Sequence, residues 1–428
     1  MRRRSQPGPS MPRADVVIIG AGLSGLACAA ELAERGAQVF VAAKGMATTH
    51  WTHGGLDVAA PPGARTMRDG IRVLAKATGH PYRTLAADAD ASVAAHLDRV
   101  AAEGLAHAGS LDDALTGIPT AIGALRPAAI LPSAQAAALV PWAGDGLLLV
   151  GFTRFRDAWA SYAARNLTHA AWPAGGPSEI RAIEVDLPEL DQRHNIAPHV
   201  LARLFEDTSW RSRAVAAIAD ALPSGTWRIG LPAVLGLDDH VAVHASVERA
   251  LGGRVFEMAS LPPSVPGLRL FEALRRRILG SGARIQIGFD VVEVERSGGR
   301  VTAIHTEAAS RTLRIGADAF VLASGGIGGA GIRAHHDGTL TERVFGLPVA
   351  APPREGWFSD DPLLPHPLEA AGIEVDANLV PAELENVRVI GSALAGMHYL
   401  DERCGDGVAL ASAHRAAASL AATHAVAA

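Results

Sequence analysis

The stretch "DVVIIGAGLSGLACAAELAERGAQVFVAAK", residues 15–44, decides the fold. Residues 15–19 form a β-branched run, which is typical of a strand that is covered on both faces. Residues 27–34 predict a helix that ends at Gly36, and residues 38–42 predict the next strand. This order of strand, helix and strand indicates the first unit of an α/β domain.

The turn between the first strand and the helix carries three glycines. Gly20, Gly22 and Gly25 match the pattern G-x-G-x-x-G, in which the first glycine allows a tight turn and the second lets a pyrophosphate approach. The third allows close packing of helix and strand, and the helix N-terminus attracts phosphates. Such domains usually carry an acidic residue about 20 residues later to hold the adenosine ribose, but this chain has Ala42, Ala43 and Lys44 there. The turn predicts nucleotide binding and leaves the ribose contact open.

Composition narrows the class of protein further. The 428 residues favour two domains, and the net charge of −5 gives no sign of nucleic acid binding. The two cysteines, Cys28 and Cys404, are too few for a disulfide framework, an iron–sulfur cluster or a structural zinc site, so no metal site is expected. The sequence shows neither an apolar run of about 20 residues nor a signal peptide. It predicts a cytoplasmic protein, or one held at the inner face of the plasma membrane by a partner.

Two later stretches favour a flavin over a nicotinamide. "FVLASGG" (320–326) looks like the second Gly-rich strand end of two-segment flavoproteins. "VRVIGSALAG" (387–396), followed by "CGDGVALASAHRAA" (404–417), looks like their C-terminal strand and helix, whose N-terminus stabilises negative charge on a reduced flavin. The expected flavin contacts are Gly20, Gly22, Gly25, Lys44, Gly54, Gly55, Ser324, Gly325, Gly391, Gly405, Gly407 and Val408.

The order of these elements predicts how the chain is divided. Residues 58–140 are rich in loops, whereas the following residues restart an alternation of strands and helices. We expect a two-segment Rossmann-like flavin-binding domain of the α/β class with an inserted α+β substrate or cap domain. The expected parts are a disordered tail (1–13), the first flavin-binding segment (14–139), the inserted domain (140–266) and the second flavin-binding segment (267–428).

Several motifs connect the chain to known flavoproteins. "THGGLD" (52–57) and the order of the pieces resemble the fumarate reductase and succinate dehydrogenase flavoprotein superfamily. The chain is more similar still to the B subunit of anaerobic glycerol-3-phosphate dehydrogenase, from residue 14 almost to its end. That resemblance implies a flavin usually assigned as FMN, a flavin-bearing A subunit, an iron–sulfur C subunit and a quinone acceptor. The further motifs that carry it are "IEVDLPELDQRHN" (183–195), "LPAVLGLDD" (231–239), "LPPSVPGLRL" (261–270) and "REGWFSDD" (354–361).

The glycine turn and the resemblance differ on the identity of the flavin. The full G-x-G-x-x-G pattern favours FAD, with other partners for the ribose hydroxyls, whereas the resemblance favours FMN, whose single phosphate also suits the turn. In some similar proteins a histidine upstream of the paired glycines carries the flavin covalently. Thr48 has that spacing here. We therefore expect a non-covalent flavin, either FAD or, as the alternative, FMN.

A glycerol phosphate requires cations for its phosphate and a base for its C2 hydroxyl. His398 lies between two expected flavin contacts, and His53 is expected to hydrogen-bond beside the flavin. Arg354 is the cation expected to reach into the cleft under the inserted domain, because its "PREGW" stretch resembles one of the family. These three are the expected catalytic residues, and the further candidates are Arg193, His194 and Arg403.

The resemblance implies oxidation of sn-glycerol 3-phosphate to dihydroxyacetone phosphate, with electrons passed to quinone through partner subunits. One alternative is a relative of the same superfamily that oxidises another small acid or alcohol. A second alternative, from a different class, is a flavin protein that only relays electrons within a complex. The inserted domain favours catalysis because it can cover the flavin, and the lack of a decisive base favours relay.

Overall fold

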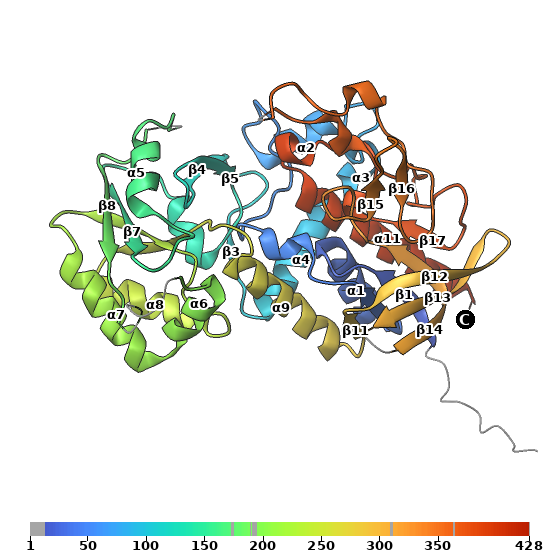
Figure 1. Ribbon diagram of the computed structural model, residues 1–428, viewed down its shortest axis with the longest axis horizontal. Helices are drawn as coiled ribbons and strands as arrows, with labels where there is room; N and C mark the ends of the chain where they lie inside the picture. The colour runs from blue at the N-terminus through green and yellow to red at the C-terminus, as the bar shows by residue number, and fades with distance from the viewer. Residues whose placement is uncertain are drawn as a thin grey trace, which may run out of the picture.

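The computed structural model describes residues 13–172, 175–188, 190, 195–308, 311–362 and 364–427, without the side chains of 308, 311 and 423–427. Residues 1–12 of the expected tail lie outside these ranges, as do the candidates Arg193 and His194. Figure 1 shows two bodies side by side. The blue and red ends of the chain share the larger body, and the green middle of the chain forms the smaller one.

The larger body is built on a seven-stranded sheet of the described residues, in the order β11-β2-β1-β14-β13-β12, with β17 also paired to β14. The pairs β1–β2, β2–β11, β1–β14 and β14–β17 are parallel, and the pairs β12–β13 and β13–β14 are antiparallel. This arrangement confirms the Rossmann-like class that the glycine-turn stretch predicts. The strands are β1 (Arg13–Ile19), β2 (Val39–Ala43), β11 (Arg284–Ile287), β12 (Asp290–Ser297), β13 (Arg300–Ala308), β14 (Arg311–Leu322) and β17 (Val387–Val389).

Four helices pack together beside this sheet (Figure 1). They are α1 (Leu23–Glu34), α4 (Ala89–Ala102), α9 (Val265–Gly280) and α11 (Gly405–Ala427). The buried carboxylate of Glu31 ties three of them together, because it pairs with Arg99 of α4 at 3.2 Å and with His414 of α11 at 3.0 Å. Helix α4 lies in the segment that the sequence describes as rich in loops, so that description misses a helix of 14 residues.

The smaller body contains a second sheet, of four strands in the order β10-β9-β7-β8. All its pairs are parallel, and its strands alternate with helices, which is the arrangement of an α/β rather than an α+β layer. Its strands are β7 (Gly146–Phe152), β8 (Ile180–Val185), β9 (Trp227–Pro232) and β10 (Arg254–Met258). Its helices are α5 (Ala160–Thr168), α6 (Pro198–Glu206), α7 (Thr208–Ala221) and α8 (His240–Leu251).

Residues ahead of position 140 also pack into the smaller body. Ile118, Ala128 and Leu131 share a hydrophobic cluster with Leu147 of β7. The fully buried guanidinium of Arg228 donates hydrogen bonds to the carbonyls of residues 137, 140 and 141. We therefore propose that the inserted domain begins near residue 116, ahead of the expected boundary at 140.

Helix α9 belongs to both bodies. Near its N-terminal end, Arg269 forms a buried ion pair with Glu257 of β10 at 2.5 Å and donates to the carbonyl of Gly236 at 2.9 Å. Burial opposes ionisation of Glu257, but the charge of Arg269 outweighs it and lowers the pKa of that carboxyl. The helix also packs on α1 and α4 of the larger body. It is therefore a structural bridge between the two bodies.

The remaining elements are short. No helix among the described residues combines the length and apolar character needed to cross a bilayer. The short strands are β3 (His107–Ala108), β4 (Thr116–Pro119), β5 (Leu125–Ala128), β6 (Leu131–Pro132), β15 (Ile332–Ala334) and β16 (Leu340–Glu342). The other α-helices are α2 (Met67–Leu74), α3 (Tyr82–Leu85) and α10 (Tyr399–Glu402).

Candidate functional site

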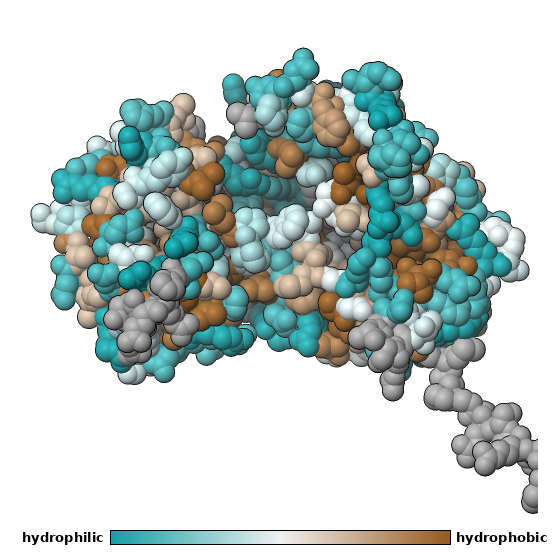
Figure 2. All heavy atoms as spheres, in the orientation of Figure 1, coloured by the Kyte–Doolittle hydropathy of each residue, from teal (hydrophilic) through white to brown (hydrophobic). Residues whose placement is uncertain are grey.

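A cavity of about 1330 Å³ lies between the two bodies. Figure 2 shows the surface hollowed between them. From the larger body, its walls include the glycine turn, the end of β2, the start of β12, the end of β14 and the start of α11. From the smaller body, they include residues 120–126, around the β4–β5 turn, and residues 259–261, after β10. The cavity therefore brings together the Gly-rich strand ends that the sequence assigns to a flavin.

The glycine turn has the geometry of a phosphate cradle. A Cβ on Gly20, where φ is +119°, would lie 2.1 Å from the carbonyl oxygen of Ala323, so only glycine fits between β1 and β14. A Cβ on Gly25 would lie 2.2 Å from the oxygen of Gly20. A Cβ on Gly22 would meet no heavy atom closer than 3.6 Å, and this residue lines the cavity. Gly20 and Gly25 thus serve packing, and Gly22 leaves room for a ligand.

Other expected flavin contacts divide into two groups. Gly20, Gly22, Lys44, Ser324, Gly325 and Gly405 line the cavity, whereas Gly25, Gly54, Gly55, Gly391, Gly407 and Val408 do not. The second group packs against protein: a Cβ on Gly407 would lie 2.0 Å from the hydroxyl of Tyr82, and one on Gly391 would lie 2.4 Å from the hydroxyl of Ser24. Direct contact of this second group with the flavin stays a prediction.

Several polar atoms in the cavity wall have no hydrogen-bond partner among the described residues. They are buried and come from both bodies. Burial of such groups is costly unless a partner is supplied. A polar ligand that fills the cavity supplies these partners, which fits a flavin with its ring amides, ribityl hydroxyls and phosphates. The atoms are His53 Nε2, Arg126 Nε, Ser260 Oγ, Ser324 Oγ and Glu369 Oε1.

A pair of carboxyl groups lies at the N-terminus of α11. The backbone N–H of Asp57 donates to Asp406 Oδ2 at 2.9 Å, and Arg126 of the β5 strand pairs with Asp57. All three residues line the cavity. Burial and the nearby charge of Asp57 raise the pKa of Asp406 to about 7. A carboxyl group that titrates near neutral pH inside a cavity has the property required of a general base.

His53 lies near this pair and lines the same cavity. Burial lowers the pKa of His53 to about 4, because the nearby charge of Asp57 compensates only in part. The imidazole is therefore neutral at physiological pH and can donate or accept one hydrogen bond at Nε2. This placement suits the hydrogen-bonding role that the sequence suggests, which stays a prediction.

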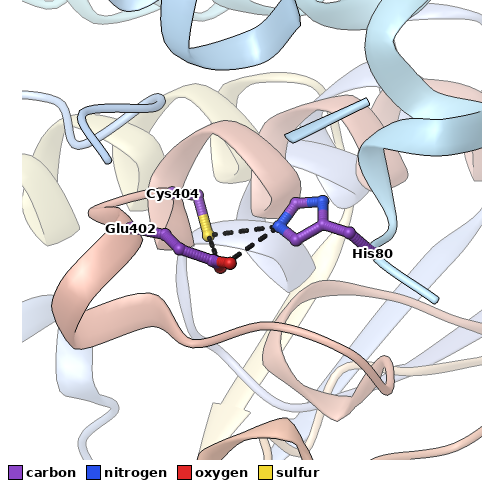
Figure 3. Close-up of side chains that lie close together, drawn as sticks. All are labelled: His80, Glu402 and Cys404. Atoms are coloured by element: carbon purple, nitrogen blue, oxygen red, sulfur yellow. Dashed lines mark hydrogen bonds and ion pairs between the residues drawn. The ribbon is translucent and has the colours of Figure 1, made fainter. Parts of the chain in front are cut away.

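His80, Glu402 and Cys404 point toward one another, as Figure 3 shows, and none of the three lines the cavity. Glu402 Oε2 lies 3.3 Å from His80 Nε2 and 3.4 Å from Cys404 Sγ. His80 Nδ1 accepts the N–H of Tyr82 at 3.0 Å, which places the ring proton on Nε2, facing Glu402. These side chains lie close enough for a metal ion, but the trio is already satisfied as a hydrogen-bonded cluster.

Arg403, which lines the cavity, lies in the chain between two members of this cluster. Arg403 has a φ of +43°, in the left-handed region that a residue with a side chain rarely adopts. Its neighbours Glu402 and Cys404 both belong to the cluster, so their hydrogen bonds hold the backbone in this conformation. Burial, followed by the charge of Glu402, raises the pKa of the Cys404 thiol, so Cys404 is a protonated packing residue.

Two of the expected catalytic residues are not in the cavity wall. The backbone N–H of His398 donates to Glu402 Oε2 at 2.8 Å, but His398 does not line the cavity. The guanidinium of Arg354 donates to the carbonyls of Asp337 at 2.9 Å and His336 at 3.3 Å, and it also stays outside the wall. The structure thus brings neither to His53, and their catalytic roles stay predictions.

Three residues of the site were missed by reasoning from the sequence. Asp57, Arg126 and Asp406 come from three distant segments and meet only in the fold. Asp57 and Asp406 lie within the quoted "GGLD" and "CGDG" stretches, and the acidic residue in each was the available signal. Arg126 lies in the Pro-containing segment ahead of residue 140 and gave no signal.

Comparison with known proteins bears on the cofactor and the family. Residues 15–408 match the family described as FAD binding domain. The probable B subunit of an anaerobic glycerol-3-phosphate dehydrogenase of Halobacterium salinarum is 31% identical over 422 residues, which cover 94% of this chain and 96% of that protein. The B subunit of the anaerobic glycerol-3-phosphate dehydrogenase of Pectobacterium atrosepticum is 33% identical over 424 residues, covering 94% and 97%. The match with the FAD binding domain confirms FAD as the cofactor, and its non-covalent attachment stays a prediction.

Solved structures of similar shape are more distant. The 3-ketosteroid delta1-dehydrogenase of Sterolibacterium denitrificans is 11% identical, with a TM-score of 0.45, and the match covers 96% of this chain and 100% of that one. A fumarate reductase FrdA chain of E. coli is 11% identical, with a TM-score of 0.43, and covers 97% and 71%.

Proposed function

Because this chain belongs to the family of anaerobic glycerol-3-phosphate dehydrogenase B subunits, a family of FAD-binding oxidoreductases, we propose that it oxidises sn-glycerol 3-phosphate to dihydroxyacetone phosphate. The observation that carries the proposal is the grouping of acidic and basic side chains at the N-terminus of α11. There Asp406, Asp57, Arg126 and Arg403 line one cavity with the glycine turn. An alcohol that bears a phosphate requires both a proton acceptor and a cation.

Asp406 is the proton acceptor in this proposal. Its carboxylate takes the proton of the C2 hydroxyl, and the pKa of about 7 balances the fraction ionised against basicity. Bound FAD supplies the two-electron acceptor for the hydride that leaves C2. Asp57 acts on Asp406 in two ways, since its charge raises the pKa and its N–H holds the carboxyl in place.

Arg403 binds the phosphate in this proposal. Among the described cations of the cavity wall, Lys44, Arg126 and Arg343 already form ion pairs, which leaves Arg333 and Arg403, and of these two Arg403 adjoins Cys404 and the start of α11. The guanidinium of Arg403 has one long hydrogen bond, to the carbonyl of Asp401 at 3.5 Å. Its donors are therefore available for a bidentate contact with a phosphate. Residues 120–126 and 259–261 of the smaller body line the cavity opposite the glycine turn, and in this proposal they limit the access of water to the reacting carbon.

The electrons leave the chain through partners. Two cysteines cannot hold a four-thiolate cluster, so an iron–sulfur relay requires another polypeptide. The relatives are named as B subunits, and we propose that this chain likewise works with a flavin-bearing subunit and an iron–sulfur subunit. Quinone is the proposed final acceptor, with the complex held peripherally at the membrane by a partner.

Dye reduction tests the proposed activity. The purified FAD-loaded chain is mixed with an artificial electron acceptor and sn-glycerol 3-phosphate, and bleaching of the dye is followed. We expect turnover with this substrate, and much weaker turnover with glycerol or with sn-glycerol 1-phosphate. No turnover by the isolated chain, together with turnover by the complex of the Asp406→Asn chain with its partners, would favour the electron-relay alternative.

A further inference from the structure

The end of β2 is where FAD-binding domains usually present an acidic side chain to the adenosine ribose. Here that position holds Lys44. The carbonyl of Ala43, the last residue of β2, accepts the N–H groups of Gly288 at 2.8 Å and Phe289 at 2.9 Å. The start of β12 is thereby fixed against the end of β2, although Ala43 and Gly288 are 245 positions apart in the sequence.

Asp290, the first residue of β12, reaches the position beside Lys44. Its Oδ2 lies 3.0 Å from Lys44 Nζ and 3.2 Å from Arg343 Nη2. All three residues line the cavity. The side chain of Asp290 is 33% exposed and that of Lys44 is 61% exposed, so this end of the cavity is open to a ligand.

The two cations leave part of the carboxylate free. Lys44 and Arg343 both approach Oδ2, whereas Oδ1 has only a long contact with Arg343, at 3.5 Å. A carboxylate oxygen accepts two hydrogen bonds, so Oδ1 has capacity for the hydroxyls of a ribose. A hydrogen bond to a carboxylate is stronger than one to a neutral acceptor.

No other acidic side chain of the described cavity wall lies near the end of β2. Apart from Asp290, the acidic residues of that wall are Asp57, Glu369 and Asp406. Asp57 and Asp406 lie together at the start of α11, and Glu369 accepts the N–H of Leu400 at 3.3 Å. Asp290 is therefore the acid next to β2.

We propose that Asp290 replaces the missing carboxylate of β2 and accepts hydrogen bonds from the adenosine ribose of FAD. Lys44 then has a positioning role, because it holds Asp290 against the end of β2. The proposal concerns the choice of FAD over FMN and is independent of the substrate. FMN lacks the adenosine ribose, so a change at Asp290 should weaken FAD binding and spare FMN.

Competition between the two flavins tests this. Full-length Asp290→Asn protein is dialysed against equal concentrations of FAD and FMN, and the bound flavins are separated and counted. Loss of a hydrogen bond to a charged acceptor lowers affinity about 10- to 150-fold, so the bound ratio of FAD to FMN should fall by that factor. The double variant Lys44→Glu with Asp290→Asn returns an acidic group to the usual position and should restore the ratio.

Arg343→Gln is the matched control, because it removes an ion pair of Asp290 but keeps the acceptor. We expect its flavin ratio to stay within a few-fold of the unchanged protein. An unchanged ratio in Asp290→Asn would overturn the proposal. So would equal losses of both flavins, or the same loss in Arg343→Gln as in Asp290→Asn, because Asp290 would then serve only the local fold. Melting curves of each variant separate unfolding from loss of ligand.

Discussion

The backbone N–H of Asp57 donates to Asp406 Oδ2 at 2.9 Å, and the carbonyl of Asp57 accepts the N–H of Asp406 at 3.1 Å. These two residues are 349 positions apart in the sequence. Their reciprocal bonds hold the first turn of α11 against the loop that follows β2. They also place two carboxyl groups in one cavity wall, so that the proton of one depends on the charge of the other.

Asp406→Asn should abolish most turnover. A general base contributes about 100- to 10,000-fold to a rate, and asparagine keeps the shape of the side chain without accepting a proton. The unchanged protein should lose activity as the pH falls below about 7, where Asp406 becomes protonated. Dye-coupled rates between pH 5 and pH 9 measure both effects. A variant that retains the rate and the pH profile would exclude Asp406 as the base.

Asp406→Asn should also make the folded protein more stable at high pH, relative to the unchanged protein. Folded Asp406 keeps its proton up to about pH 7, whereas an unfolded aspartate releases it near pH 4. The folded state therefore binds more protons in that range, and stability falls as the pH rises through it. Relative to the unchanged protein, Asp406→Asn should be more stable at pH 8 than at pH 5. Thermal melting at the two values, with FAD bound, provides the comparison.

Gly22→Val should remove the flavin and keep the fold. A Cβ at this position meets no protein atom within 3.6 Å, so the added side chain occupies ligand space. Absorbance of the purified protein should show little bound flavin, and circular dichroism should show the unchanged secondary structure. Gly25→Ala is the contrast, since its Cβ would lie 2.2 Å from the Gly20 oxygen and should disturb folding itself. Stoichiometric flavin in Gly22→Val would show that this turn does not hold the cofactor.

Arg403→Gln should weaken substrate binding selectively. Loss of a charged hydrogen bond to a phosphate costs about 1.5–3 kcal/mol, which raises the dissociation constant about 10- to 150-fold. Titration of the flavin absorbance with sn-glycerol 3-phosphate measures this at constant flavin content. Arg354→Gln is the matched control, because Arg354 binds backbone carbonyls away from the cavity wall. If the Arg354 variant shows the selective loss instead, the phosphate lies elsewhere.

Glu257→Gln should destabilise the fold without touching the cavity. It leaves the guanidinium of Arg269 buried without its charge partner, and breaking a buried ion pair costs about 3–5 kcal/mol. Urea denaturation followed by tryptophan fluorescence measures the loss. The double change Glu257→Met with Arg269→Met removes both charges and should cost less than the single change. A loss below about 1 kcal/mol in Glu257→Gln would show that the pair matters little.

Much of the fold follows from local patterns. The β-branched run, the three glycines and the Ala-rich helix predict β1, α1 and β2, and the "CGDG" stretch predicts the start of α11 at Gly405. Each of these signals lies within about 30 residues of sequence. Helix α4 was missed, because its sequence "ADASVAAHLDRVAA" mixes small, polar and charged residues and forms a helix where α11 and α9 cover it. Tertiary packing decides that segment.

The site itself depends on contacts between distant segments. The pairs Asp57–Asp406 and Lys44–Asp290 join residues that no local pattern connects. Arg126 enters the cavity only because the β4–β5 hairpin packs with the smaller body. The sequence drew attention to Lys44 through the absence of an acid, but it gave no means of finding the residue that stands beside it.

Helix α9 restricts how the two bodies can move apart to open the cavity between them. Its N-terminal half is clamped to the smaller body by the ion pair of Arg269 and Glu257, and it also packs on α1 and α4. Movement of one body away from the other must therefore either break the packing of α9 on α1 and α4 or separate the buried charges of Arg269 and Glu257. Both routes carry a high barrier. The two bodies are therefore expected to keep their relative position while a ligand enters or leaves the cavity between them.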